Sequence, residues 1–253
     1  MHDDNCFLII PASGTGSRMN TDTPKQYLKL ENGSTLLDQS LETLLDMDQI
    51  SGCVVAISDN DEYFMTSPYY SHPKLLATAK GGRERFHSVL NALSTLIEFA
   101  KDDDWVLVHD AVRPCIKKED VERLISELQN HPIGGILAVE VVDTLKKVGN
   151  EDVVGTIERN KLYQAQTPQM FRIGLLKQAL EKVVEDNDHI TDEAEAIERL
   201  GHSIKIVSSS KSNIKITHLD DLKLANYYLN KPGQQKPELD KTLTHSKRYQ
   251  ENL

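Results

Sequence analysis

Two cations follow a stretch of the chain that has almost no side chains. Residues 11–18, with the sequence PASGTGSR, come directly after the apolar run CFLII at residues 6–10, and Lys25 follows Arg18. A glycine-rich turn after a strand lets backbone N–H groups approach phosphate oxygens, and the start of a following helix adds a positive end. We therefore expect this loop to bind phosphate, with Arg18 and Lys25 neutralising charge that the backbone alone cannot neutralise.

The loop matches neither of the two best-known nucleotide-binding motifs. Met19 stands where the dinucleotide fingerprint needs a third glycine, and Gly16 is not followed by the Lys-Ser/Thr pair of a Walker A loop. A flexible loop with two solvated cations would be the better explanation of a glycine-rich segment alone. The preceding strand and the pair of cations favour phosphate binding instead.

A second glycine pair opens an amphipathic segment. Gly81 and Gly82 precede residues 85–99, in which apolar side chains recur at helical spacing. Glycines at a strand-to-helix junction allow the backbone to approach a ligand closely, but a tight turn explains them equally well. Ser88, one turn into this helix, could offer its hydroxyl to a base or a ribose.

An aspartate follows the apolar strand expected at residues 105–108. Such a strand would present Asp110 at the carboxyl edge of an α/β sheet, where ligands bind. Beside a triphosphate, this carboxylate can hold Mg²⁺ directly or through water. The alternative is a capping aspartate that pairs with Arg113.

A lysine near the end of the chain is the fourth candidate. Lys215 lies within residues 213–217, NIKIT, which we expect to form a short strand. A helix should then begin at Thr217, with Asp220 as its capping partner. Lys215 could point from the strand end into a cleft, or it could be exposed on an edge strand.

Composition and charge narrow the class of protein. The chain has a formal net charge of −10, and no apolar run approaches the roughly 20 residues that span a bilayer. The acidic charge argues against nucleic acid as the main partner, but local cations could still bind an anionic small molecule. The cysteines are widely spaced and the N-terminus lacks the basic start of a secretory signal, so we expect a cytoplasmic protein with free thiols. The histidines do not have the spacing of metal ligands. Neither a Ser–His–Asp nor a Cys–His arrangement is evident, which disfavours hydrolysis through a covalent intermediate.

Strands and helices are expected to alternate along most of the chain. This alternation predicts an α/β domain with a mostly parallel sheet covered on both faces. Apolar runs predict strands at residues 7–10, 54–57, 105–108, 135–139 and 204–207, and helical spacing predicts helices at residues 36–45, 85–99, 119–128, 173–184 and 192–200.

The section from residue 138 to residue 167 interrupts this alternation. Short β-prone pieces at 145–148 and 153–157 flank the turn GNED, which is typical of a hairpin. The hairpin is either an inserted arm or an edge hairpin of the main sheet. We expect a single domain over residues 1–230, with the arm at about 138–167, and a polar, disordered tail at 231–253.

Eight motifs, taken together and in order, resemble the family of 2-C-methyl-D-erythritol 4-phosphate cytidylyltransferases. The resemblance runs from about Cys6 to about Leu229, and each motif alone would be weak. The motifs lie at residues 11–19 with 24–27, 81–85, 109–114, 143–144, 159–160, 166–169, 190–194 and 213–215.

The resemblance implies a three-layer, Rossmann-like nucleotidyltransferase domain with an inserted β-hairpin arm. It implies transfer of CMP from CTP to 2-C-methyl-D-erythritol 4-phosphate in the non-mevalonate route to isoprenoids, with Mg²⁺ held largely by the CTP phosphates. The substrate phosphate is already a nucleophile, so alignment and charge neutralisation are needed and a strong general base is not. The arm would cross into a neighbouring subunit, which implies a homodimer with shared sites.

The resemblance and the loop chemistry also assign individual residues. Arg18 and Lys25 would stabilise the transition state, and Lys215 would lie near the α-phosphate. The expected catalytic residues are Arg18, Lys25, Arg159 and Lys215; the expected CTP-binding residues are Ala12, Ser13, Gly14, Gly16, Gly82, Arg83, Ser88, Asp110 and Ala111, with Asp110 also the metal ligand; the expected acceptor-binding residues are Thr144, Arg159, Thr167 and Arg113.

Two departures and three rival functions remain. Ser13 stands where many members of the family carry alanine, and Arg83 where some carry aspartate; a backbone contact at position 83 would make that exchange harmless.

The nearest rival function is that of a pentitol-phosphate cytidylyltransferase that acts on ribitol 5-phosphate. A UTP-dependent sugar nucleotidyltransferase is less favoured. A non-catalytic nucleotide-binding module should have lost one of the four cations, and all four are present.

Overall fold

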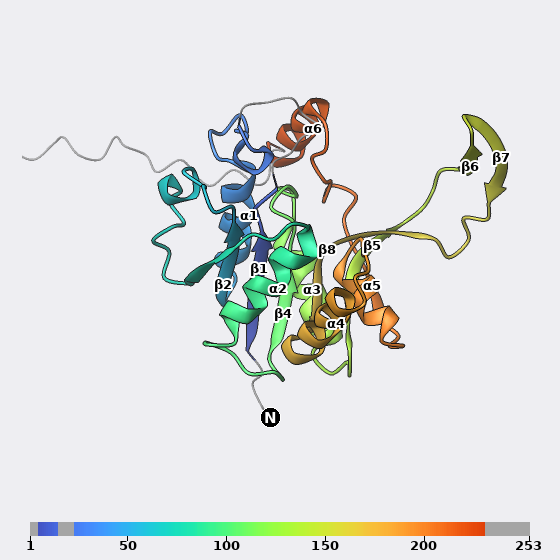
Figure 1. Ribbon diagram of the computed structural model, residues 1–253. Coiled ribbons are helices and arrows are strands. Elements are labelled where there is room, and N and C mark those ends of the chain that lie inside the picture. Colours follow the sequence, from blue (N-terminus) through green and yellow to red (C-terminus); the bar gives the residue numbers. More distant parts are fainter. Residues whose placement is uncertain (1–4, 15–22, 231–253) are drawn as a thin grey trace, which may run out of the picture.

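A twisted sheet lies at the centre of the molecule, and helices cover both of its faces (Figure 1). The computed structural model describes residues 5–14 and 23–230. Within these residues the strands are β1 (Cys6–Pro11), β2 (Ile50–Ile57), β3 (Leu75–Lys80), β4 (Trp105–Val108), β5 (Gly134–Glu140), β6 (Leu145–Gly149), β7 (Asp152–Ile157), β8 (Tyr163–Arg172) and β9 (Lys205–Ser208). The helices are α1 (Leu36–Leu45), α2 (Arg85–Leu96), α3 (Lys118–Leu128), α4 (Ile173–Glu185), α5 (Glu193–Arg199) and α6 (Leu219–Leu229), with short 3₁₀ turns η2 (Lys25–Tyr27) and η3 (Phe64–Thr66).

The order of the strands fixes where a ligand can bind. The main sheet has the order β3-β2-β1-β4-β8-β5-β9, and of the described strands in this sheet only β8 runs antiparallel to its neighbours. From β1 the chain moves outward through β2 and β3 and then returns to β4 on the other side of β1. The loops after β1 and β4 therefore diverge, and this switch point is where open α/β sheets bind ligands. The predicted fold class is confirmed.

The apolar strands are buried on both faces, which is why they lack a polar alternation. In β1, Leu8 and Ile10 contact the core under α1 and α3, whereas Phe7 and Ile9 contact the core under α2, α4 and α5. All four side chains are buried. Consecutive side chains of a strand point to opposite faces, so one short apolar run supports both layers of helices.

Two strands are absent from the predicted set. β3 has the sequence LLATAK and lies at the edge of the sheet, where only part of its surface is buried. β8 has the sequence YQAQTPQMFR, whose first half is polar and which contains Pro168. The register between β5 and β8 shifts between Ile136 and Ala138, whose partners are Gln169 and Ala165. Pro168 lies in this irregular part of the ladder, where a missing N–H is tolerated, and so the strand continues past it.

The segment that carries Lys215 differs from its prediction. Residues 213–217 form an extended connection with no strand, so the expected strand is wrong. Ile216 donates its backbone N–H to the carbonyl of Val112 at 2.9 Å. That contact fixes the segment against the loop after β4 without building a ladder.

The cap of α6 also lies one residue from its expected place. His218 is the N-cap residue, and its partner is Asp221, so the predicted pairing of Thr217 with Asp220 is wrong. The Asp221 carboxylate accepts the backbone N–H groups of Thr217 and His218 at 2.7 and 2.8 Å and the Thr217 hydroxyl at 2.9 Å. Three donors at one carboxylate favour this register over the one in which Asp220 is the cap partner.

The hairpin predicted at residues 145–157 is confirmed, and it belongs to an arm. β6 and β7 pair only with each other, in a separate two-stranded sheet among the described strands, and they project away from the body (Figure 1). Asn150 and Glu151 form the turn with φ of 48° and 72°, the left-handed conformation that a two-residue hairpin turn requires. The alternative of an edge hairpin on the main sheet is therefore wrong. The division into one domain and a tail stays a prediction, and residues 231–253 lie outside the described residues.

The helices in the described residues are too short or too polar to cross a membrane.

We predict that Asp221→Ala lowers the free energy of unfolding by about 1 kcal/mol, because the first turn of α6 loses its cap. Asp220→Ala is the matched control, since the Asp220 side chain is exposed and pairs only with exposed Lys223 among the described residues. Chemical denaturation of both variants measures the difference. Equal losses in the two variants would contradict the assigned cap.

Candidate active site

A pocket of about 440 Å³ opens at the switch point of the sheet. Its walls come from the loop after β1, the turn η2, the junction of β3 with α2, the loop after β4 and the connection before α6. Many of the predicted residues meet here although they are far apart in the sequence. The predicted residues that line the pocket are Ala12, Ser13, Gly14, Lys25, Gly82, Arg83, Ser88, Asp110, Ala111 and Lys215.

The glycine pair at the start of α2 is required by packing within the protein. A Cβ added to Gly81 would lie 2.2 Å from the Cβ of Ser13, and one added to Gly82 would lie 2.3 Å from the Cβ of His87. The Gly82 N–H donates to the Ser88 hydroxyl at 2.9 Å, and this hydroxyl is 2.9 Å from that of Ser13. The two loops therefore touch at one corner of the pocket, and this close packing requires glycine at both positions.

Lys25 is held at the pocket by its two neighbours in η2. The side chain of Gln26 is buried and donates to the carbonyl of Ala12 at 2.5 Å. The Tyr27 hydroxyl donates to Asp61 at 2.7 Å, and its ring stacks on Tyr63. Gln26 thus joins the two ends of the loop that begins at β1. The sequence alone gave no signal for this role, because a buried glutamine is recognisable only once its partner is known.

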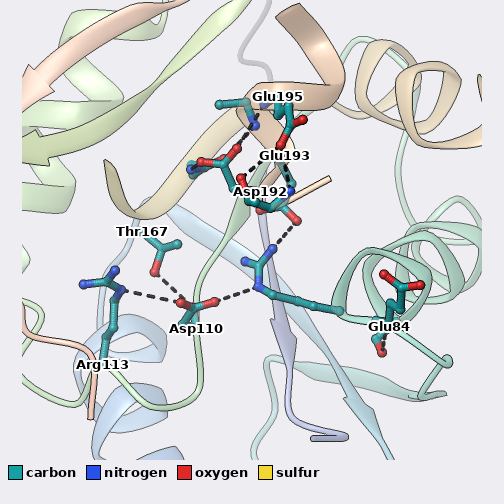
Figure 2. A network of polar contacts seen from close by, with 12 residues as sticks. Glu84, Asp110, Arg113, Thr167, Asp192, Glu193 and Glu195 are labelled. Carbon is teal, nitrogen blue, oxygen red and sulfur yellow. Dashed lines mark hydrogen bonds and ion pairs between the residues drawn. The ribbon is translucent and has the colours of Figure 1, made fainter. Parts of the chain in front are cut away.

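A buried carboxylate connects three cations at the floor of the pocket. Asp110 Oδ1 accepts from Arg85 Nε at 2.8 Å, and Oδ2 pairs with Lys215 Nζ at 2.9 Å and with Arg113 Nε at 3.5 Å. Its backbone N–H donates to the Thr167 hydroxyl at 3.0 Å. Figure 2 shows Asp110 with Arg113 and Thr167 beside it and Glu193 farther along the same network.

The charge state of Asp110 follows from these contacts. Burial alone would raise the pKa of the Asp110 carboxyl, but Arg85, Lys215 and Arg113 together outweigh burial and hold this pKa well below its ordinary value. Asp110 is therefore ionised at neutral pH. The ammonium of Lys215 is the exposed end of the group, with 45% of its side chain accessible.

Arg113 and Thr167 lie behind the pocket and do not line it. Both are buried. Arg113 donates to the carbonyl of Asn213 at 2.7 Å, and Asn213 in turn donates to the carbonyl of Thr167 at 2.8 Å. Arg113 and Thr167 thus support Asp110, and their expected contact with the acceptor stays a prediction.

Two of the remaining predicted residues, Thr144 and Arg159, are not brought to this pocket. Thr144 and Arg159 are exposed on the segments that connect the arm to the body, and Arg159 donates to the carbonyl of Val142. Figure 1 shows the arm pointing away from the switch point. Arg18 and Gly16 lie outside the described residues.

The pocket can be tested for its fit to Mg²⁺. Its lining contains two carboxylates, Glu84 and Asp110. Glu84 lies 2.5 Å from His189 Nδ1, and Asp110 is already paired with cations. Within the described residues no group of three His, Cys, Asp or Glu side chains could hold a metal. A hard cation at this pocket would therefore have to be held mainly by phosphate oxygens, because both lining carboxylates already have partners.

A mostly parallel sheet with backbone amides, lysines and two carboxylates at its switch point is typical of an α/β enzyme that binds a phosphorylated nucleotide. The profile of one family, described as 2-C-methyl-D-erythritol 4-phosphate cytidylyltransferase, matches residues 6–231. The chain belongs to this family.

Relatives and solved structures agree with this assignment. A protein of the same description from Ruthia magnifica is 54% identical over 230 residues, which cover 88% of this chain and 96% of the relative. One from Pseudomonas putida is 48% identical over 218 residues, covering 85% of this chain and 92% of the relative. The crystal structure of the enzyme of this description from Francisella tularensis is 42% identical and superimposes with a TM-score of 0.78, covering 89% of this chain and all of that one.

We predict that His109 is neutral in the folded protein at pH 7. Burial is the main cause that lowers its pKa to about 4, against an ordinary value of 6.5. The unfolded chain then binds a proton that the folded chain does not, so stability falls as the pH drops from about 6.5 toward 4. An NMR titration of the imidazole protons measures the pKa, and a midpoint above about 6 would contradict the prediction.

Proposed function

We propose that this protein transfers CMP from CTP to 2-C-methyl-D-erythritol 4-phosphate, giving 4-diphosphocytidyl-2-C-methyl-D-erythritol and pyrophosphate. The proposal is carried by one observation: Lys25, Asp110 and Lys215 border the same pocket as the backbone of residues 12–14 and Gly82. Membership of the cytidylyltransferase family supports the choice of both substrates.

The reaction is an in-line displacement at phosphorus. A phosphate oxygen of the acceptor attacks the α-phosphorus of CTP and forms a new P–O bond. The bond from that phosphorus to the bridging oxygen of the β-phosphate breaks, and the pyrophosphate leaves with the electron pair. The attacking phosphate is already ionised, so the protein is required to align two anions and to neutralise the charge that grows on the oxygens.

The cations that neutralise this charge come from different parts of the chain. Lys25 lies beside the loop after β1, where the triphosphate would lie against backbone amides, and Arg18 belongs to the same loop in sequence. Lys215 offers its ammonium from the connection before α6, fixed by Asp110, and Lys25 Nζ lies 3.5 Å from the carbonyl of Thr217 in the same connection. We assign Arg18, Lys25 and Lys215 to the stabilisation of the transition state. A bound Mg²⁺ would neutralise phosphate charge as a Lewis acid, with Asp110 as its protein ligand.

The base and ribose belong at the junction of β3 with α2. The backbone of Ala12, Ser13, Gly82, Arg83 and Ala111, with the hydroxyl of Ser88, borders this side of the pocket. Arg83 is exposed, which fits a contact through its backbone. The tight junction of the two loops at Gly81 would make this corner rigid enough to select a pyrimidine.

The acceptor site needs the arm of a second subunit. Thr144 and Arg159 would bind the phosphate of the acceptor, yet both lie on an arm that projects away from the pocket of its own chain (Figure 1). The arm exposes Val148, Val153 and Val154, apolar side chains that a partner would cover. We infer a homodimer in which each arm completes the partner's site.

We also propose that the protein is cytoplasmic. The three cysteines are unpaired and buried, which suits a reducing compartment.

The activity is tested by pyrophosphate release with CTP and each of two acceptors, methylerythritol 4-phosphate and ribitol 5-phosphate. We expect turnover with the first and a rate at least about tenfold lower with the second. Lys25→Ala should lower kcat by about 100-fold or more, the effect of removing one preorganised charge contact, while CTP binding by calorimetry is retained. No release with either acceptor would refute the proposed function.

The shared site is tested by mixing two inactive variants, Lys215→Ala and Arg159→Ala. In a mixed dimer, one site combines an intact Lys215 with an intact Arg159 from the other chain, so random exchange should restore about a quarter of the wild-type activity. If each arm served its own pocket, every site would keep one lesion and no activity would return.

A further inference from the structure

A fully buried carboxylate lies behind the pocket, and the proposed reaction gives it no role. Glu193 is the first residue of α5, has no exposed surface, and accepts from Arg85 Nη1 at 2.5 Å. The position of Glu193 is fixed by contacts of its neighbours with β8. Gln169 donates to the Asp192 carboxylate at 2.9 Å and accepts the N–H of Ala194 at 2.9 Å, so the residues on both sides of Glu193 are anchored.

Arg85 joins this carboxylate to the pocket. Its Nε donates to Asp110 Oδ1 at 2.8 Å while its Nη1 donates to Glu193, and Asp110 Oδ2 pairs with Lys215. Charges of opposite sign therefore alternate from the buried Glu193, through Arg85 and Asp110, to the half-exposed Lys215. Figure 2 shows Asp110 and Glu193 in one continuous network.

Stability does not explain this arrangement. Buried ion pairs contribute little net stability, because desolvation offsets their attraction. In the part of the chain that the structure describes, Arg85 Nη2 and Glu193 Oε2 are buried without a hydrogen-bond partner. Unsatisfied buried polar atoms lower the stability of a fold, so the cluster is better explained by what it does at the pocket.

We propose that Glu193 and Arg85 are positioning residues for Lys215. Glu193 takes a share of the positive charge of Arg85, so Asp110 keeps enough negative charge to hold the Lys215 ammonium at the pocket wall. Without the Glu193 carboxylate, Arg85 would face Asp110 alone, and Lys215, which is half exposed, would turn toward solvent. This inference rests on the proposed function, in which Lys215 meets the α-phosphate.

Steady-state kinetics at saturating CTP and acceptor test the proposal in the full-length protein. Glu193→Gln retains an acceptor for Arg85 but removes the charge. We expect kcat to fall about 10- to 100-fold, the scale of a small misplacement of a reacting group, with little change in either KM. Glu193→Asp, which keeps the charge, should recover part of the loss.

Glu195→Gln is the matched control on the same helix. Glu195 pairs with Arg199 at 2.8 Å and accepts from Thr191, and no contact joins it to Asp110 among the described residues. Its kcat should stay within about twofold of wild type, since a partly exposed ion pair contributes little. In a double-mutant cycle, Glu193→Gln added to Arg85→Gln should have no further effect, because both act through one guanidinium.

Three outcomes separate the possibilities. Wild-type kcat in Glu193→Gln, together with an inactive Lys215→Met, would overturn this inference and leave the proposed function standing. Full activity in Lys215→Met would refute the role proposed for Lys215 itself. If circular dichroism shows that Glu193→Gln does not fold, Arg85→Lys is used in its place. A single ammonium cannot bridge both carboxylates, so it should show the same fall in kcat, and wild-type kcat in this variant would likewise overturn the inference.

Discussion

The carboxylate of Asp110 is the contact on which the pocket depends. It sits after β4, between the helix that begins at Arg85 and the connection that carries Lys215, and it binds both through different oxygens. Burial would favour the neutral acid, but the surrounding cations keep it ionised. A protonated Asp110 would hold neither cation well, and the walls from α2 and from residues 213–217 would lose their common anchor.

The loop after β1 is organised by a different kind of contact. Gln26 and Tyr27 are neutral, and their hydrogen bonds to Ala12 and Asp61 place Lys25 without adding charge to the pocket. One wall is thus set by ion pairs and the other by neutral hydrogen bonds and ring stacking. The ammonium of Lys25 lies 3.5 Å from the carbonyl of Thr217, and that of Lys215 is oriented by the carboxylate of Asp110.

Local patterns in the sequence predicted the parts of this structure whose causes are local. Apolar runs located β1, β4 and β5, because strands buried on both faces must be apolar throughout. The turn at Asn150 and Glu151 located the hairpin. β8 was not predicted, because its strand character depends on its pairing with β4 and β5 on either side, and a proline is unusual in a central strand. An isolated segment does not contain that information.

In the site, too, features with local causes were predicted and features that depend on the whole fold were not. Lys25, Asp110 and Lys215 were identified by residue type and by motif, and they do border one pocket. The burial of Arg113 and Thr167 behind Asp110 could not be predicted, because burial is a property of the whole fold, and their contact with the acceptor stays a prediction. Arg85 and Glu193 stand within two of the quoted motifs, but their pairing spans more than a hundred residues of chain and has no local signature.

The place of β8 in the sheet has a consequence for the order in which the molecule can assemble. β4 and β5 leave the ribosome first, yet they never pair with each other, because β8 lies between them in the finished sheet. Until residue 172 has been made, each of these apolar strands presents an open edge. A nascent chain that stops earlier has the strands β3-β2-β1-β4 with an open edge at β4, and its β5 has no partner, because β9 also follows β8 in the chain. Unpaired apolar edges of this kind favour aggregation until β8 fills the gap between β4 and β5.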